Sequence, residues 1–170
     1  MVCLNVTVVT RLAHTFARHM VDKGRGGIML VGSLLGRQGV PGMSSYAATK
    51  AYVHNLAESL HHELKPRGID VLLLQPGLVH TGLAARAGLK YGSATTPEVV
   101  ARAAVAALGK RASVIPGVRA RFLVTWLSLL PRRLRSRFVG DAFRRMRTAA
   151  TAAAVDPDDS RQRFAVSNGD

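Results

Sequence analysis

The sequence predicts an α/β protein with a parallel β-sheet, because short apolar stretches alternate with segments of helical periodicity. Apolar residues recur at helical spacing from residue 4 to 22 and stop before the glycine-rich turn Gly24-Arg25-Gly26-Gly27. The next stretch, Ile28 to Val31, is short, apolar and flanked by glycines, which is typical of a strand buried on both faces. Residues 36–42 contain a proline and several glycines and are expected to form a loop.

The same alternation continues along the chain. A second helix is expected from about Ser44 to Leu64, and Asp70 to Gln75 is a second strand of the buried type that ends at Pro76-Gly77. Thr96 then precedes a proline and an acid, which is typical of a helix start, and that helix is expected to close at Gly109. A third strand is expected at residues 112–115, and one or two basic amphipathic helices, broken near residue 131, at 119–147.

Length and composition limit the class of protein. A chain of 170 residues with 48% hydrophobic residues is long enough to bury a core and favours a single domain. The single cysteine, Cys3, excludes an intrachain disulfide framework and is expected to be a buried small hydrophobe. No signal peptide is recognisable, and the apolar stretch at residues 122–130 is far shorter than the roughly 20 residues of a spanning helix. A cytoplasmic location is therefore expected.

Positive charge is concentrated in the second half of the chain. The formal net charge is +14, and Lys110 to Arg147 contains eleven Lys or Arg residues and one acid, Asp141. The favoured interpretation is an ordinary solvated face. The alternatives are contact of residues 118–147 with an anionic membrane surface, which would make the protein peripheral to the membrane, and nucleic-acid binding. Nucleic acid is the least favoured, because the segment has no recognisable reading motif and few aromatic residues for stacking.

Three residues form the candidate catalytic centre. Tyr46 and Lys50 are one helical turn apart at the start of the second helix, and Ser33 follows the first strand. A phenol normally loses its proton at about pH 10, so it acts as a reversible acid near neutrality only where a neighbouring cation stabilises the phenolate. Lys50 supplies that cation. Ser33 can donate a hydrogen bond to a substrate carbonyl oxygen, and Tyr46 can protonate that oxygen when the carbonyl is reduced.

Four motifs occur in the order found in a known family. With them the chain resembles the C-terminal part of a short-chain dehydrogenase/reductase, a family of NAD(P)-dependent oxidoreductases with an extended Rossmann fold, a doubly wound parallel sheet. The resemblance covers residues 1–117 and, more loosely, the segment to about 140. The motifs are Leu4-Asn5-Val6, Gly32-Ser33-Leu34-Leu35-Gly36, Tyr46-Ala47-Ala48-Thr49-Lys50 and Pro76-Gly77-Leu78-Val79-His80-Thr81.

The resemblance implies a role for each matching residue. Tyr46 would be the acid/base, Ser33 would orient the substrate carbonyl, and Lys50 would modulate Tyr46 and bind the nicotinamide ribose. Asn5 would hold a water that links the active-site lysine to solvent. The loop residues Pro76, Gly77, Val79 and Thr81 would bind the nicotinamide carboxamide, with Tyr46 and Lys50 completing the cofactor contacts. NAD or NADP is the implied cofactor, and no metal is implied.

One part of the family pattern is missing from these 170 residues. The glycine-rich turn that binds the cofactor pyrophosphate, the residue that selects NAD or NADP, and the first four strands of the family's sheet have no counterpart. The sequence is therefore interpreted as a truncated form with a partial Rossmann-like fold, and the strand at 28–31 is expected to be an uncovered apolar edge. The expected divisions are a catalytic half at 1–117, a basic helical extension at 118–150 and a disordered tail at 151–170.

The function expected from these observations is hydride transfer between a nicotinamide cofactor and a carbonyl or alcohol substrate. Apolar residues after Thr81, namely Leu83, Leu89 and Tyr91, favour a hydrophobic substrate. The family also implies a homo-oligomer through the helices that carry Asn5 and Tyr46. The alternative is a non-catalytic fragment that acts as an interaction or peripheral membrane-binding module. Two adjacent histidines, His61 and His62, lack the spacing of a zinc-protease helix and are expected to be exposed.

Overall fold

The computed structural model describes residues 1–80 and 94–154, with side chains described to residue 146. Within these residues, three parallel strands form one sheet in the order β1-β2-β3. Strand β1 (Gly26–Val31) pairs with β2 (Ile69–Leu74) over its whole length, and β2 pairs with the short β3 (Ser113–Val114). The expected parallel α/β arrangement is confirmed, and the third strand is shorter than expected.

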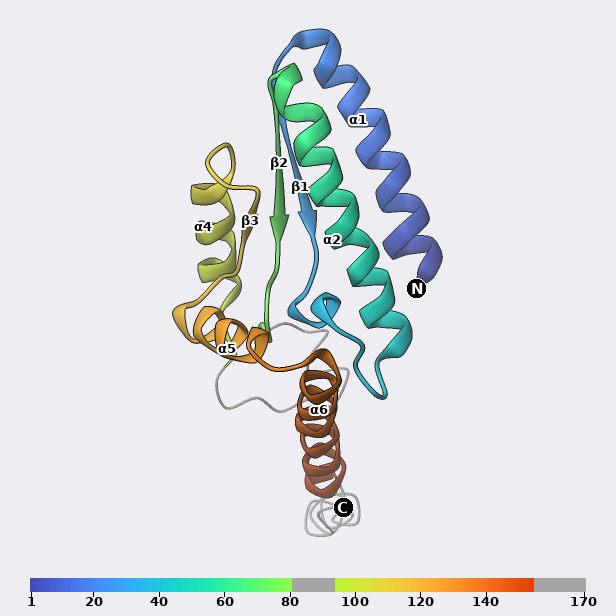
Figure 1. Cartoon of the computed structure of the whole chain (residues 1–170), viewed down its shortest axis with the longest axis vertical. Coiled ribbons are helices and arrows are strands. Elements are labelled where there is room, and N and C mark those ends of the chain that lie inside the picture. Colours follow the sequence, from blue (N-terminus) through green and yellow to red (C-terminus); the bar gives the residue numbers. More distant parts are fainter. Residues whose placement is uncertain (81–93, 155–170) are drawn as a thin grey trace, which may run out of the picture.

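Helices cover both faces of this sheet (Figure 1). Helix α1 (Val9–Lys23) precedes β1, α2 (Ser44–Leu64) precedes β2, and α4 (Pro97–Ala107) precedes β3. Figure 1 shows α1 and α2 on one side of the strands and α4 on the other. The core between the strands and the α1–α2 layer consists of Ala13, Ala17, Ile28, Leu30, Val53, Ala57, Ile69, Val71 and Leu73.

Strand β2 is the centre of the fold. Its residues Ile69, Val71 and Leu73 face the α1–α2 layer, and Leu72 and Leu74, which alternate with them, are also buried. Burial of both faces explains why this strand is continuously apolar in sequence. In the part of the chain that the structure describes, β1 pairs only with β2, and Val31 at its end is 50% exposed. The expected apolar sheet edge is therefore present.

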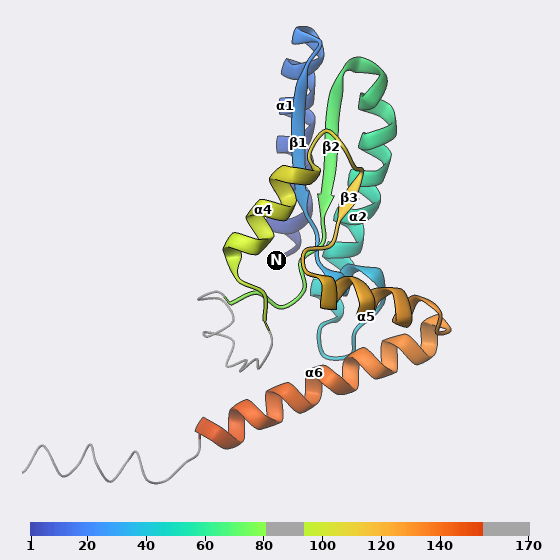
Figure 2. The ribbon, with the colours of Figure 1, turned by 90° about the vertical axis from the view of Figure 1, so that its left-hand side faces the viewer.

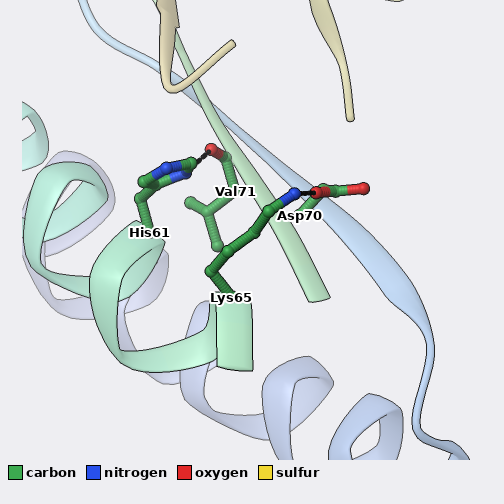
Figure 3. Close-up of polar contacts among 4 residues, drawn as sticks. All are labelled: His61, Lys65, Asp70 and Val71. Carbon is green, nitrogen blue, oxygen red and sulfur yellow. Dashed lines mark hydrogen bonds and ion pairs between the residues drawn. The ribbon is translucent and has the colours of Figure 1, made fainter. Parts of the chain in front are cut away.

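The turn between α2 and β2 lies at the end of the sheet opposite the candidate site. Figure 3 shows that His61 donates a hydrogen bond from its Nδ1 to the Val71 carbonyl oxygen at 3.0 Å and that Lys65 pairs with Asp70 at 2.6 Å. The expectation that both adjacent histidines are exposed is thus wrong for His61, which is half-buried because it ties the helix to the strand. The Lys65–Asp70 pair is largely exposed and is expected to contribute little to stability.

Two local features differ from the expected elements. The first helix was expected from residue 4, but Cys3–Val8 forms a π-helical segment (η1), and the regular α-helix begins at Val9. Cys3 was expected to be buried, but it is exposed, because this segment lies outside the core cluster. A 3₁₀ turn, η2 (Leu34–Arg37), begins three residues after the end of β1 and includes the first two residues of the loop expected at 36–42.

Two further helices lie beyond the carboxyl ends of the strands. Helix α5 (Val118–Ser128) runs below β3, and α6 (Arg132–Ala154) extends past it (Figures 1 and 2). The break between them falls at the expected proline, Pro131. Gly140 of α6 packs so closely on the loop after η2 that a Cβ there would lie 2.7 Å from Pro41 Cδ. Among the described residues, no helix has the length and apolar character needed to cross a membrane.

Candidate active site

The candidate site lies where β1 and β2 end. Ser33 follows β1, and Pro76 and Gly77 follow β2, so parallel strands bring these loops to one edge of the sheet. Main-chain hydrogen bonds join the two loops past the strand ends, from Gly32 N–H to Leu74 O at 2.8 Å and from Leu34 N–H to Pro76 O at 3.0 Å. Main-chain hydrogen bonds therefore hold the two loops together independently of their side chains.

Ser33 is held by hydrogen bonds of both its backbone N–H and its side-chain hydroxyl. The residue is buried, and its N–H donates to His54 Nε2 at 3.3 Å. Its Oγ accepts a hydrogen bond from Leu35 N–H at 3.2 Å, which caps the start of η2. Because the main chain uses an Oγ lone pair, the hydroxyl hydrogen of Ser33 is left to donate to another group.

Tyr46 and Lys50 lie in the first turns of α2, as the sequence predicted. The Lys50 Nζ atom is 5.8 Å from the centroid of the Tyr46 ring, and both residues are half-buried. Lys50 Nζ also donates to Val31 O at 2.9 Å, so the ammonium group is anchored at the end of β1. Burial lowers the pKa of Lys50 below its ordinary value. The structure thus fixes a cation beside the phenol.

Asn5 is connected to the same helix. Its Nδ2 donates to Thr49 Oγ1 at 3.1 Å, and Thr49 Oγ1 donates to the Tyr46 carbonyl oxygen at 2.9 Å. Thr49, which directly precedes Lys50 in the sequence, is buried. Because Asn5 lies in the π-helical segment η1, the irregular turn and the asparagine together join the start of the chain to the first turn of α2.

The loop after β2 is ordered by a bridge to the segment before α4. Thr95 N–H donates to Leu78 O at 2.9 Å, and His80 N–H donates to Thr95 O at 3.0 Å. In a parallel bridge of this kind, the N–H and C=O groups of the intervening residue, Val79, point to the opposite side. The main-chain N–H and C=O groups of Val79 therefore point away from Thr95 and are not used in this bridge. Thr81, the last predicted residue of this loop, lies outside the described residues.

The sequence prediction missed His54, which lies behind Ser33. The His54 side chain is half-buried, and its pKa is lowered first by burial and then by the positive charges of Arg37 and Lys50. The signal that would have found it is its spacing, because Tyr46, Lys50 and His54 recur every fourth residue and so share one face of α2.

A second missed pair is Arg37 and Gln75. An Nη atom of Arg37 donates to Oε1 of the buried Gln75 at 2.8 Å, which links η2 to the end of β2. Burial and the nearby guanidinium of Arg135 lower the pKa of Arg37. The rim of the site is therefore positively charged. Among the described residues, no three His, Cys, Asp or Glu side chains gather in a group able to hold a metal ion.

A parallel sheet with helices on both faces binds ligands at the carboxyl ends of its strands, and Ser33 and the Lys50 ammonium lie at the end of β1. The family model of the short chain dehydrogenases matches residues 1–91, which is more than half of the chain. The chain belongs to that family.

Individual relatives agree with this assignment. The 3-oxoacyl-[acyl-carrier-protein] reductase FabG of Vibrio cholerae is 34% identical over 97 residues, which are 57% of this chain and 40% of the relative. A solved 7β-hydroxysteroid dehydrogenase has a TM-score of 0.74 at 28% identity and covers 82% of this chain, which corresponds to 56% of that structure. A short-chain dehydrogenase of Sphingobium yanoikuyae in complex with NADPH has a TM-score of 0.62 at 32% identity, covering 75% of this chain and 52% of its own. The chain spans about half the length of the relatives it matches.

Proposed function

We propose that the chain carries the catalytic centre of an NAD(P)-dependent oxidoreductase that interconverts a carbonyl and an alcohol. The observation that carries this proposal is the position of Lys50, whose ammonium is anchored to Val31 O at 2.9 Å and lies 5.8 Å from the Tyr46 ring. A tyrosine with a fixed cation beside it, at the carboxyl end of a parallel sheet, is suited to proton exchange with a bound substrate.

The chain's own residues divide the acid–base work. Ser33 donates its hydroxyl hydrogen to the substrate oxygen and orients the carbonyl, because its lone pair is already occupied by Leu35 N–H. Tyr46 delivers the proton to that oxygen, and Lys50 stabilises the resulting phenolate. Asn5 is a positioning residue, because it holds Thr49 and through it the carbonyl group of Tyr46.

The residues present fit the nicotinamide end of the cofactor. The outward-facing main chain of Val79 matches the donor and acceptor pattern of a carboxamide, and Lys50 supplies donors for ribose hydroxyls. Tyr46, Pro76, Gly77 and Thr81 complete the set that we assign to the cofactor. When bound, the cofactor supplies or accepts the hydride in the reaction.

The proposed substrate is a small hydrophobic carbonyl or alcohol. Support comes from the relatives, one of which is named for hydroxysteroids. The apolar residues Leu83, Leu89 and Tyr91, which first suggested such a substrate, lie outside the described residues.

The proposal includes a homo-oligomer formed through the outer sides of α1 and α2. Large apolar side chains are exposed there, including Leu12 at 51% and Phe16 at 54%. On α2, Tyr52 is 38% exposed and shares a hydrogen bond of 2.8 Å with Thr10. Light scattering that reports a monomer at high concentration would contradict this part of the proposal.

A cofactor titration tests the proposed function. Nicotinamide fluorescence is measured as NADH or NADPH is added up to millimolar concentration, with wild type and with Lys50→Met. We expect enhanced fluorescence with wild type and a weaker effect with the variant, because the variant loses the ribose contact. Absence of any enhancement would rule out independent catalysis by these residues and would favour the alternative, a non-catalytic fragment that acts through interactions.

A further inference from the structure

Helix α5 exposes an apolar face away from the body of the protein. Its side toward the sheet carries Ala120, which lies 4.0 Å from the position a Cβ would take on Gly77. The apolar residues of the exposed face are Phe122, Trp126 and Leu129, with exposed fractions of 66%, 59% and 74%. A helix that is apolar on its outer side as well as its inner side is expected to bury the outer side against a binding partner.

Two aromatic side chains of this face contact each other. The rings of Phe122 and Trp126 lie one turn apart on α5 with centroids 5.9 Å apart. The next helix continues the pattern, because Leu134 and Phe138 of α6 are also one turn apart and are 51% and 58% exposed. Such a concentration of large exposed apolar side chains on consecutive helices marks an interaction surface.

Positive charge accompanies these apolar residues. From residue 118 to 146 the sequence contains eight arginines and one acid, Asp141, and Asp141 is already paired with Arg144. Exposed arginines occur on the same two helices, and three of them, Arg121, Arg133 and Arg137, directly precede Phe122, Leu134 and Phe138; the others are Arg119 and Arg132. Exposed aromatic and aliphatic residues flanked by arginines are typical of helices that lie in the interface of an anionic membrane.

We propose that α5 and the first turns of α6 form a docking surface for an anionic lipid membrane. The charge decides between a membrane and a second copy of the chain, since two copies would bring two sets of arginines together with few acids between them. The helices would lie in the headgroup region and not cross the bilayer, because no described helix is long and apolar enough to span it. This proposal does not depend on the proposed oxidoreductase activity.

The chain contains a single tryptophan, Trp126, which makes the proposal directly measurable. The full chain is mixed with vesicles of phosphatidylcholine alone or with added phosphatidylglycerol, and sedimentation and tryptophan fluorescence are recorded. We expect binding to the anionic vesicles, a blue shift of Trp126 emission, and quenching by brominated lipid. Binding is expected to weaken as salt is added, because salt screens the arginines.

Matched variants separate the apolar and charged contributions. Phe122→Ser with Leu129→Ser is compared with Val99→Ser with Val105→Ser on α4, where both valines are exposed (39% and 73%) but lie on another part of the molecule. Arg133→Glu with Arg137→Glu is compared with Arg11→Glu with Arg18→Glu on α1, which changes the net charge equally. We expect at least tenfold weaker vesicle binding for each α5 or α6 double variant and wild-type binding for each control, with unchanged circular dichroism for all of them.

Three results would overturn the proposal. The first is no binding to anionic vesicles. The second is binding that is equal on neutral vesicles and insensitive to salt. The third is a Trp126 emission that is already blue-shifted without lipid, together with light scattering that reports an oligomer dispersed by Phe122→Ser with Leu129→Ser. The third result would assign this face to a second copy of the chain.

Discussion

Replacement of Gly36 by alanine tests how closely η2 and α2 must approach to build the site. A Cβ on Gly36 would lie 2.8 Å from the Lys50 carbonyl carbon, 2.9 Å from the Lys50 carbonyl oxygen and 2.9 Å from His54 Nε2. Two of these three atoms belong to the helix backbone, which cannot rotate away as a side chain can. Gly36→Ala therefore forces η2 and α2 apart at the position of the proposed catalytic lysine.

The magnitude follows from the overlap. Ordinary carbon contacts begin at about 3.5 Å, so the added methyl overlaps the backbone of α2 by several tenths of an ångström. Overpacking of this kind lowers the free energy of unfolding by about 1–3 kcal/mol. With a urea dependence of about 2 kcal/mol per molar, the unfolding midpoint should fall by about 0.5–1.5 M.

The matched control is Gly39→Ala, three residues further along the same loop. A Cβ on Gly39 meets no heavy atom within 4 Å. This control should unfold at the wild-type midpoint or slightly above it, because alanine reduces the freedom of the unfolded chain. Urea unfolding followed by circular dichroism measures both variants. Equal midpoints for Gly36→Ala and Gly39→Ala would refute the proposed close approach of η2 and α2.

Two further predictions concern His54 and the core. Because burial lowers the pKa of His54, the unfolded chain takes up its proton more readily, so the wild type should lose stability as pH falls below about 6.5. His54→Gln should show a smaller loss over the same range, and identical pH profiles would contradict a neutral, half-buried His54. Ile69 is 0% exposed at the start of β2. Ile69→Ala should therefore lower the free energy of unfolding by about 2–5 kcal/mol. A change below about 1 kcal/mol in denaturant unfolding would show that Ile69 is not in a packed core.

Much of the fold could be predicted from periodicity. The strand at Val71 is continuously apolar because both of its faces are covered, whereas the strand at Ile28 buries Ile28 and Leu30 and leaves Val31 50% exposed. The helices around them are amphipathic because they have one buried side. The π-helical segment around Asn5 could not be predicted in this way. It accompanies a hydrogen bond from Asn5 to Thr49, 44 residues away, and local sequence carries no signal for such a contact.

The candidate site was also predicted only in part. Ser33, Tyr46 and Lys50 are recognisable because chemistry requires their side chains and their spacing is regular. The position of His54 depends on the absence of side chains at Gly32 and Gly36, where a Cβ would lie 2.6 Å and 2.9 Å from His54 Nε2. The prediction therefore required knowledge that two segments approach closely in space, which one sequence does not contain.

The rate of nicotinamide-dependent carbonyl reduction in a pair of tyrosine variants tests the central claim most directly. Tyr46→Phe removes the proposed acid, and Tyr52→Phe removes the hydroxyl of a second tyrosine on the same helix that contacts Thr10 instead of the site. Oxidation of NADH and NADPH is followed with a panel of hydrophobic ketones. The account predicts a rate lower by about a hundredfold or more for Tyr46→Phe and a rate within about twofold of wild type for Tyr52→Phe. Equal rates for Tyr46→Phe and wild type would contradict it.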